Sequence, residues 1–374
     1  MTIHRRPLLL AAALAAALPP VRALAQSNDI VLGHTGVLTG PLGAPVKTML
    51  AGAELAFADA NAAGGVGGRK VRVVSLDDEL KPDKAVANYE KLLTESKAFA
   101  FFSCVGSGTT AAASKILKES GAPLVGGFAV ADSAREKTRG SGYYVRATSG
   151  REAEALVQHL TTIGITKIAI AHLDNPGGVE VLKLIEAALA AHQLKPLAAA
   201  GVKGDASNAD AAAKMLAAVD PQAVLMYLGG AVGGNVMKAM WALGQHPSFY
   251  GMSIVPGDLI AKVVGEQTRG LAISQVVPYP WNEIDPVVKE YRKRAEAAKV
   301  QVGYYSFEGY VNALVMLDAL KRAGRDASRE RLHSVLRATK LRIAGMDVDF
   351  TTGQHTGSRF VELVQVTHEG RFIR

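Results

Sequence analysis

The residues best placed to do chemistry lie in two short segments that follow apolar runs. The first segment is the loop His34–Val46, directly after the apolar run Ile30–Leu32. The second is Gly106-Ser107-Gly108-Thr109, which follows the apolar run Ala98–Cys104. Backbone N–H groups and hydroxyls at the start of a helix suit an anionic ligand, because several donors converge there. Ser107 also suits the N-cap position of that helix, and the two roles are compatible.

Other reactive residue types do not form a recognisable catalytic or metal-binding pattern. Asp77 and Asp78 are adjacent, but neighbouring strand residues point to opposite faces, which favours a polar strand end. Cys104 is the single cysteine, and its apolar surroundings indicate a buried thiol. The histidines lack metal-ligand spacing, and we interpret His34 as hydrogen-bonded to backbone. Without a G-x-G-x-x-G, P-loop or G-x-S-x-G motif, we expect no cofactor, no metal and no catalytic centre.

The elements that must position these segments begin with a β-α-β pattern over residues 30–78. An apolar strand, a Gly-rich loop, a helix, a Gly-rich turn and a second strand follow one another. In the expected helix 46–60, Met49, Ala53 and Phe57 fall at intervals of four residues, which predicts a face that packs on a sheet. Ligands gather beyond the carboxyl ends of parallel strands, and the loop 34–46 lies at such an end.

Helical and strand patterns alternate through the rest of the chain. Further helices are expected at 82–96, 109–120, 151–163, 178–192, 208–219, 232–243, 287–299, 307–323 and 328–338. Further strands are expected at 98–103, 123–127, 167–172, 197–202, 223–228, 249–254 and 271–277, and a late pair at 346–350 and 359–366 is joined by the turn-rich segment 351–357. The alternation of strands and helices begins again near residue 150 and is interrupted by the prolines after residue 277. We therefore expect two α/β halves, with the late helices covering the first.

The amino-terminal segment 1–25 has the layout of a secretory signal peptide. It combines a charged start at His4–Arg6, an apolar run at Leu8–Leu18 and a small-x-small site at Ala23–Ala25. The apolar run is too short to span ~30 Å of hydrocarbon. We expect export to the bacterial periplasm, and Arg5-Arg6 leaves both the general secretory and the twin-arginine routes open.

Composition agrees with a two-domain globular protein that does not bind nucleic acid. The chain has 374 residues, of which 49% are hydrophobic and 20% charged, so a large core is available. The net charge of +8 falls to +5 when the three arginines of the expected signal peptide are removed. The remaining Lys and Arg residues form no basic stripe, which argues against nucleic acid.

Five segments carry a resemblance to a known family. They are VLTGPLG at 37–43, GAELAFADANAAGGVGGRKV at 52–71, DDELKPDKAVANYEKLL at 77–93, GSGT at 106–109 and YLGG at 227–230. With them the chain resembles the type I periplasmic solute-binding proteins, the Leu/Ile/Val-binding (branched-chain amino-acid) receptor family of ABC transporters. The similarity extends over the whole mature chain.

The resemblance implies an α/β fold of two doubly wound, Rossmann-like lobes joined by three crossing segments. Lobe 1 would comprise residues 27–148 and 277–353, and lobe 2 residues 149–276 and 354–374. A small-molecule ligand would lie between the lobes, which close by a hinge. The implied partner is an ABC-type inner-membrane permease, and we expect a monomer.

The family's ligand-binding positions are matched by residues of both lobes. They are Leu42, Gly106, Ser107, Phe128, Ala129, Val130 and Tyr305 in lobe 1, and Gly177, Ala231 and Ser253 in lobe 2. Val130 replaces a hydroxyl residue that is common in amino-acid receptors. Ser253 stands where an acidic residue would bind the ligand's ammonium group, and Asp258 nearby is better interpreted as a helix cap. Gly177 and Ala231 replace aromatic residues, which leaves space, while Phe128, Tyr305 and Tyr279 offer aromatic surface.

These departures predict a small carboxylate ligand without an α-ammonium group, either aromatic or short aliphatic. The alternative ligand is a branched-chain amino acid. A sensor that passes ligand binding to a signalling partner is a second function class, and a small-molecule enzyme is a third. A fused kinase or a membrane span would mark a sensor, whereas turnover of the bound ligand would mark an enzyme.

Overall fold

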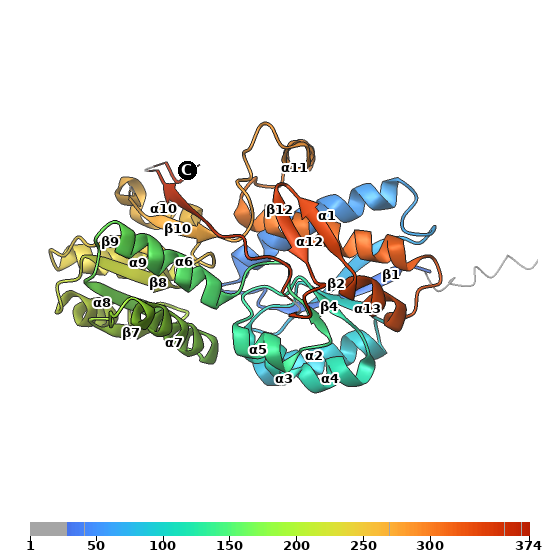
Figure 1. Ribbon diagram of the computed structural model, residues 1–374, viewed down its shortest axis with the longest axis horizontal. Coiled ribbons are helices and arrows are strands. Elements are labelled where there is room, and N and C mark those ends of the chain that lie inside the picture. Colours follow the sequence, from blue (N-terminus) through green and yellow to red (C-terminus); the bar gives the residue numbers. More distant parts are fainter. Residues whose placement is uncertain (1–27, 41, 269, 355, 368) are drawn as a thin grey trace, which may run out of the picture.

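The computed structural model describes residues 28–40, 42–268, 270–354, 356–367 and 369–374. The predicted signal peptide at 1–25 lies outside the described residues. Two sheets, each covered by helices, lie side by side and define two lobes (Figure 1). None of the helices in the described ranges is both long and apolar enough to cross a membrane.

The first lobe is built on a five-stranded parallel sheet. Its strand order is β2 (Val71–Asp77), β1 (Ile30–Gly36), β3 (Ala100–Phe102), β4 (Leu124–Val125) and β5 (Gly142–Tyr143). Every residue of β1 is buried, as expected of a strand in a sheet covered on both faces. The first lobe's amino-terminal helices are α1 (Gly43–Ala62), α2 (Pro82–Thr94), α3 (Ser107–Ala112), α4 (Ser114–Ser120) and α5 (Asp132–Lys137).

Three late helices and a hairpin complete the first lobe. They are α11 (Pro286–Ala297), α12 (Tyr304–Ala323), α13 (Arg329–Arg337) and the strands β11 (Lys340–Ile343) and β12 (Met346–Asp349). Helices α1 and α12 cross where each presents a glycine. A Cβ on Gly52 would lie 1.8 Å from the Ser306 carbonyl oxygen, and one on Gly309 would lie 1.8 Å from that of Met49. Glycine is therefore required at both positions for this close packing.

The second lobe is built on a seven-stranded mixed sheet. Its order is β14 (Phe372–Ile373), β13 (Glu362–Val366), β10 (Ala272–Gln275), β9 (Ser248–Gly251), β8 (Ala223–Tyr227), β6 (Ile168–Leu173) and β7 (Ala199–Val202). Strands β6 to β10 run parallel, whereas β13 is antiparallel to β10. Its helices are α6 (Ser149–Thr162), α7 (Pro176–Ala191), α8 (Ala209–Ala217), α9 (Val232–Ala242) and α10 (Gly257–Val264), with a 3-10 turn at Gly265–Thr268.

The chain passes between the lobes three times, which agrees with the predicted fold class. The crossings lie between β5 and α6, between β10 and α11, and between β12 and β13. The late helices share an apolar core with the first sheet, in which Phe57, Phe102, Tyr291 and Phe307 are fully buried. The second lobe has a separate core. The lobe boundaries at residues 148, 276 and 353 stay a prediction.

Two expectations about individual elements are wrong. The helix expected at 109–120 is divided at Ala113 into α3 and α4. The late strands do not form a pair, because β12 pairs with β11 and β13 joins the sheet of the second lobe. The short elements α5, β5, β11 and β14 had not been expected at all.

Candidate functional site

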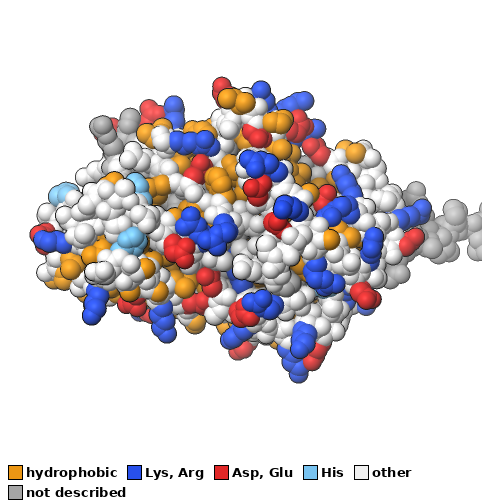
Figure 2. All heavy atoms as spheres, viewed as in Figure 1, with side chains coloured by type: hydrophobic (Ala, Val, Ile, Leu, Met, Phe, Trp, Pro, Cys, Tyr) orange, Lys and Arg blue, Asp and Glu red, His pale blue; other side chains and the backbone are white. Residues whose placement is uncertain are grey.

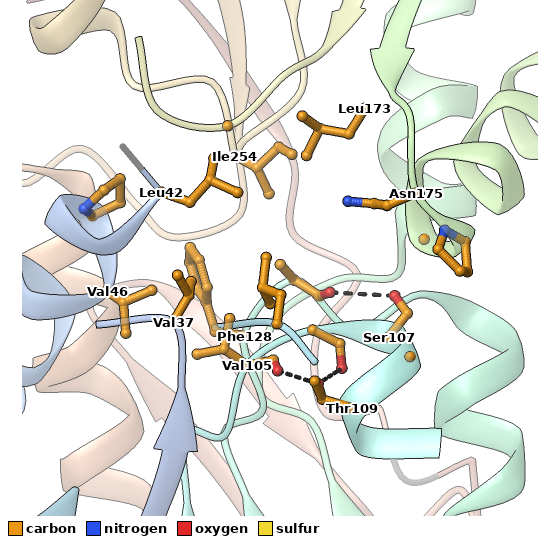
Figure 3. Close-up of a pocket in the computed structure, with 18 of the residues that line it drawn as sticks. Val37, Leu42, Val46, Val105, Ser107, Thr109, Phe128, Leu173, Asn175 and Ile254 are labelled. Atoms are coloured by element: carbon orange, nitrogen blue, oxygen red, sulfur yellow. Dashed lines mark hydrogen bonds between the residues drawn. The ribbon is translucent and has the colours of Figure 1, made fainter. Parts of the chain in front are cut away.

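A cavity of about 190 Å³ lies between the lobes, beyond the carboxyl ends of strands of both sheets (Figure 3). Its lining is mostly apolar, and none of the described residues that line it carries a charge. The first lobe contributes Val37, Leu42, Pro45, Val46, Leu80, Pro82, Val105, Gly106, Ser107, Gly108, Thr109, Phe128 and Ala129. The second lobe contributes Leu173, Asn175, Pro176, Gly177, Tyr227, Gly229, Gly230 and Ile254.

The first lobe offers free backbone donors at the start of α3. The N–H groups of Ser107, Gly108 and Thr109 make no hydrogen bond to any described residue, and the first such bond runs from the Thr110 N–H to the Gly106 carbonyl. The hydroxyls of Ser107 and Thr109 instead form hydrogen bonds with backbone groups of neighbouring segments. Ser107 Oγ accepts the Ala131 N–H at 2.9 Å, and Thr109 Oγ1 donates to the Val105 carbonyl. Three adjacent N–H groups in a polar turn are suited to a carboxylate.

The segment 128–131, to which Ser107 is hydrogen-bonded, contains a backbone conformation that is rare outside glycine. Ala129 has a φ of 51°, in the left-handed region, and it lines the cavity beside Phe128. The Ser107 Oγ lies 3.4 Å from the Ala129 carbonyl oxygen, and the Gly106 N–H donates to the Phe128 carbonyl at 3.0 Å. Strained residues of this kind persist where surrounding contacts hold them, often at functional sites.

Leu42 reaches across the cleft from the first lobe into a space that glycines of the second lobe leave open (Figure 3). A Cβ on Gly229 would lie 3.0 Å from Leu42 Cδ2, and one on Gly204 would lie 3.4 Å from Leu42 Cδ1. Similarly, a Cβ on Gly177 would lie 3.1 Å from Ser107 Oγ. Gly177 therefore borders both the cavity and Ser107 of the opposite lobe, and the free space expected beside it stays a prediction.

The structure brings together six of the ten predicted ligand-binding residues in the cavity wall. They are Leu42, Gly106, Ser107, Phe128, Ala129 and Gly177. The other four lie outside the wall. Val130 is buried in the core of the first lobe, and Ala231 occupies the N-cap position of α9. Tyr305 lies behind Phe128, with 5.8 Å between ring centroids, and its hydroxyl donates to the Ser253 carbonyl at 3.2 Å.

Ser253 belongs to a buried ionic network instead of the cavity wall. Arg146 forms ion pairs of 3.2 Å with Glu152 of the second lobe and with Glu308 of the first. Ser253 Oγ is hydrogen-bonded to both Arg146 and Glu152, and the Ser253 N–H donates to Glu152 at 2.8 Å. The position expected to face a ligand ammonium is thus fully occupied within the protein.

The network places one guanidinium between two carboxylates behind Phe128. The Arg146 guanidinium carbon lies 5.2 Å from the centroid of the Phe128 ring. Phe128 also lines the cavity. Burial raises the pKa of Glu308, and Arg146 opposes that shift. Burial lowers the pKa of Arg146, but Glu308 and Glu152 outweigh it, so the pKa is raised and the guanidinium stays charged.

The remaining sequence candidates have structural roles. His34 Nδ1 lies 3.1 Å from the Phe102 carbonyl oxygen, which confirms its interpretation as bonded to backbone. Cys104 is buried, which confirms the prediction of a buried thiol, and burial raises the pKa of that thiol to about 12. The expected cap role of Asp258 is wrong, because no side-chain bond caps α10 and Asp258 instead accepts the Gln301 amide at 3.1 Å.

Sequence reasoning missed the two polar side chains with which the second lobe lines the cavity. Asn175 precedes α7, and its Oδ1 caps that helix by accepting the Gly178 N–H at 2.8 Å. Tyr227 ends β8, and its hydroxyl makes no hydrogen bond to a residue that the structure describes. The Asn-Pro start of the helix was a usable signal for Asn175. Tyr227 begins the YLGG segment that carries the family resemblance, but its place at the end of an apolar strand gave no sign of a ligand-facing hydroxyl.

The fold and the site define a two-lobed α/β protein with a mostly apolar cavity between its lobes. The family model described as periplasmic binding protein matches residues 29–371, and the chain belongs to this family. Members of the family are solute-binding receptors, not enzymes, and they work with ABC transporter permeases.

Individual relatives agree with this assignment. The Leu/Ile/Val-binding protein of Escherichia coli (strain K12) is 24% identical over 262 residues, which cover 68% of this chain and 70% of that protein. A substrate-binding periplasmic protein from Ralstonia solanacearum has 28% identity and a TM-score of 0.86, covering 92% of this chain and 99% of that one. A solute-binding protein from R. palustris in complex with benzoate has 19% identity and a TM-score of 0.81, over 92% and 95% of the two chains, and shows the shared fold.

Proposed function

We propose that this protein is the periplasmic receptor of an ABC importer and that it traps a small carboxylate without an α-ammonium group. The ligand would be an aromatic or short aliphatic acid, which the protein hands on unchanged. The observation that carries the proposal is the uncharged wall of the cavity, in which no described residue is acidic. The apolar residues of both lobes would enclose the hydrocarbon part of the ligand.

An ammonium group would find no counter-charge in this cavity. The nearby acidic groups Glu152 and Glu308 are already paired with Arg146 and are themselves buried. Enclosing an unpaired cation would cost several kcal/mol at least, because closure removes its water. A carboxylate is in a better position, because the N–H groups of Ser107, Gly108 and Thr109 are free to donate to it.

The relatives of this chain include receptors for both kinds of ligand. The Escherichia coli relative is named for leucine, isoleucine and valine, whereas the R. palustris structure holds benzoate. The missing acidic group favours the second kind of ligand for this chain. A branched-chain amino acid is the alternative that the experiment must test.

Isothermal titration calorimetry with matched ligands tests the proposal. Leucine and 4-methyl-2-oxopentanoate differ only in the ammonium and oxo groups, while benzoate and phenylacetate represent aromatic acids. We expect the acids to bind with micromolar affinity, about −8 kcal/mol, and leucine to bind at least a hundredfold more weakly. Tight binding of leucine without a response to the acids would contradict the proposal.

The proposal also includes the compartment, the oligomeric state and the transport partner. We expect cleavage after residue 25, a monomer in solution and association with an inner-membrane permease. On the face shown in Figure 2, basic and acidic side chains are interspersed over both lobes, which offers no continuous basic surface for nucleic acid. Mass determination of the exported protein and co-purification with its permease check these points. Retention of the signal segment or capture of a receptor kinase would count against them.

A further inference from the structure

We propose that Tyr227 and Asn175 form the polar recognition pair of the second lobe and select a ligand with an uncharged oxygen group. That group would be a hydroxyl or a carbonyl, placed away from the carboxylate that the first lobe holds. This inference rests on the proposed function and narrows the class of ligand. It adds two residues of the cavity wall that the sequence resemblance did not point to.

Tyr227 carries a polar group that the protein itself leaves without a partner. The residue is 5% exposed and lines the cavity at the carboxyl end of β8. Its hydroxyl makes no hydrogen bond within the described part of the chain, and it is not among the described side-chain atoms that are both buried and unpartnered, so it is accessible from the cavity. Burial raises the pKa of the Tyr227 phenol, so the hydroxyl stays protonated and able to donate. A ligand in the cavity would supply the missing partner.

Asn175 presents only its amide nitrogen to the cavity. The Oδ1 atom is fixed by the Gly178 N–H at 2.8 Å, so the side chain cannot turn this acceptor toward a ligand. Figure 3 shows the Asn175 side chain pointing into the open space between the lobes, and its Nδ2 has no hydrogen-bond partner among the described residues. The amide therefore offers two free N–H donors to the ligand.

The two groups together define what the far end of the ligand must be. Asn175 Nδ2 donates only, so its partner must be an acceptor, and an ammonium group is excluded there. Tyr227 both donates and accepts, so it fits a carbonyl oxygen or a hydroxyl. A site built to bind an oxygen discriminates against an analogue that lacks it, because its buried donors are then left unpaired. A purely hydrocarbon acid would therefore bind less well than its hydroxy or oxo counterpart.

Calorimetric titration of matched acids tests the inference. Benzoate is compared with 3- and 4-hydroxybenzoate, and pentanoate with 4-oxopentanoate. We expect the oxygen-bearing member of at least one pair to bind about tenfold more tightly to the native protein. Tyr227→Phe should abolish this preference and leave the affinity for the hydrocarbon member within about twofold. Equal preference in the native protein and in Tyr227→Phe would overturn the inference.

Two further variants separate recognition from structure. Asn175→Asp keeps an N-cap acceptor for α7 but removes both donors, so the ratio of affinities for 4-oxopentanoate and pentanoate should fall about tenfold. Tyr250→Phe is the matched control, since Tyr250 lies on the neighbouring strand β9 and does not line the cavity. Tyr250→Phe should leave the ratio of affinities for the oxygen-bearing and hydrocarbon acids unchanged in every pair. A changed ratio would overturn the assignment of oxygen recognition to Tyr227.

Two readouts distinguish failure of this inference from failure of the proposed function. If none of the acids binds, the proposed function is wrong and the inference falls with it. If the acids bind but neither variant changes the ratios, only the inference is wrong. The melting temperature of ligand-free Tyr227→Phe gives an independent check, because loss of an unpaired hydroxyl should not lower it. A fall of several degrees relative to Tyr250→Phe would show an internal partner and overturn the inference.

Discussion

Asp77 and Asp78 are adjacent at the end of β2, yet their surroundings give them opposite properties. Burial by itself would raise the pKa of Asp77. Hydrogen bonds from Thr39, Leu38 and Glu79 outweigh this effect, so the pKa of Asp77 is lowered overall. Asp78 is fully covered, and burial raises its pKa to about 6 despite bonds from the Leu80 N–H and the Thr35 hydroxyl. Neither carboxylate faces the cavity. Both order the chain that leads to it, and they should respond to pH in opposite directions.

The substitution Asp78→Asn should change the pH dependence of stability. The folded pKa of about 6 lies above the ordinary value near 3.9, so the folded state binds more protons between these values. Stability therefore falls as pH rises through this window, and the charged form costs at most roughly 3 kcal/mol above it. Denaturant unfolding of both proteins from pH 4 to pH 7 measures this. The stability of Asp78→Asn relative to the native protein should increase with pH.

The neighbouring substitution Asp77→Asn is the control for that measurement. The folded pKa of Asp77 is lowered, so its stabilisation is present above its ordinary pKa and is lost as pH falls through the folded pKa. The stability of Asp77→Asn relative to the native protein should therefore decrease as pH rises through the acidic range. If the stability of both variants relative to the native protein changed in the same direction with pH, the opposite pKa shifts assigned to Asp77 and Asp78 would be contradicted.

At the scale of elements, glycines decide how closely the loops of the two lobes approach. Leu42 precedes α1, and Gly229 follows β8 in the opposite lobe, where an added Cβ would make a tight contact of 3.0 Å with the Leu42 side chain. Gly177, in the first turn of α7, is related to Ser107 of α3 in the same way. These glycines are not in the left-handed region, so their role is the space they leave. Closure of the cavity thus depends on small residues in one lobe and larger ones in the other.

The substitution Gly229→Ala should weaken ligand binding without unfolding the protein. The new Cβ would lie 3.0 Å from Leu42 Cδ2 of the opposite lobe, a contact that separation of the lobes would relieve. We expect an affinity loss of roughly three- to tenfold, about 1 kcal/mol, and a nearly unchanged melting temperature of the ligand-free protein. Calorimetry with the best ligand of the panel measures the first quantity.

The double variant Leu42→Ala, Gly229→Ala provides the matched test of that mechanism. Removing the Leu42 side chain frees the space that the new methyl group needs, so the two effects should not add. The double variant should bind about as well as Leu42→Ala alone. Additive losses would place the effect of Gly229→Ala somewhere other than the contact with Leu42.

At the scale of the whole molecule, polar contacts connect the lobes around the cavity. Glu180 of α7 accepts the Ser133 N–H of α5 at 2.7 Å and its hydroxyl at 2.5 Å. Asp258 of α10 accepts the amide of Gln301, and Tyr305 of α12 donates to the Ser253 carbonyl. Bonds of this kind form only when the lobes are together, so they favour the closed state.

The substitution Glu180→Gln should shift the protein toward an open state. Loss of the charge weakens both bonds to Ser133, which as exposed contacts are worth about 1 kcal/mol at most. Apparent affinity falls with the fraction of binding-competent protein, so we expect a decrease of two- to fivefold. Small-angle scattering of the ligand-free variant should show a larger radius of gyration. Glu186→Gln, an exposed position on the same helix, should change neither quantity.

Much of the fold was predictable from the sequence, because its signals are local. The strand Ile30–Gly36 and the helix Gly43–Ala62 follow from apolar runs and periodicity, and the turn at Ser107 follows from glycines and hydroxyls. The pairing of late strands was not predictable. Whether β13 joins β12 or β10 depends on a crossing between lobes, and the antiparallel contact of Ile273 with Val364 joins residues far apart in sequence.

The sequence by itself determined the class of fold, the first-lobe turn that offers free donors, and six of the residues that line the cavity. Only the tertiary structure showed that Ser253 bonds to Arg146 and Glu152, and that Leu42 fills the space beside Gly229. The physical reason is that charge neutralisation and packing depend on distance in space. Arg146 and Glu308 are 162 positions apart, and no local pattern could show that they form an ion pair behind the cavity wall.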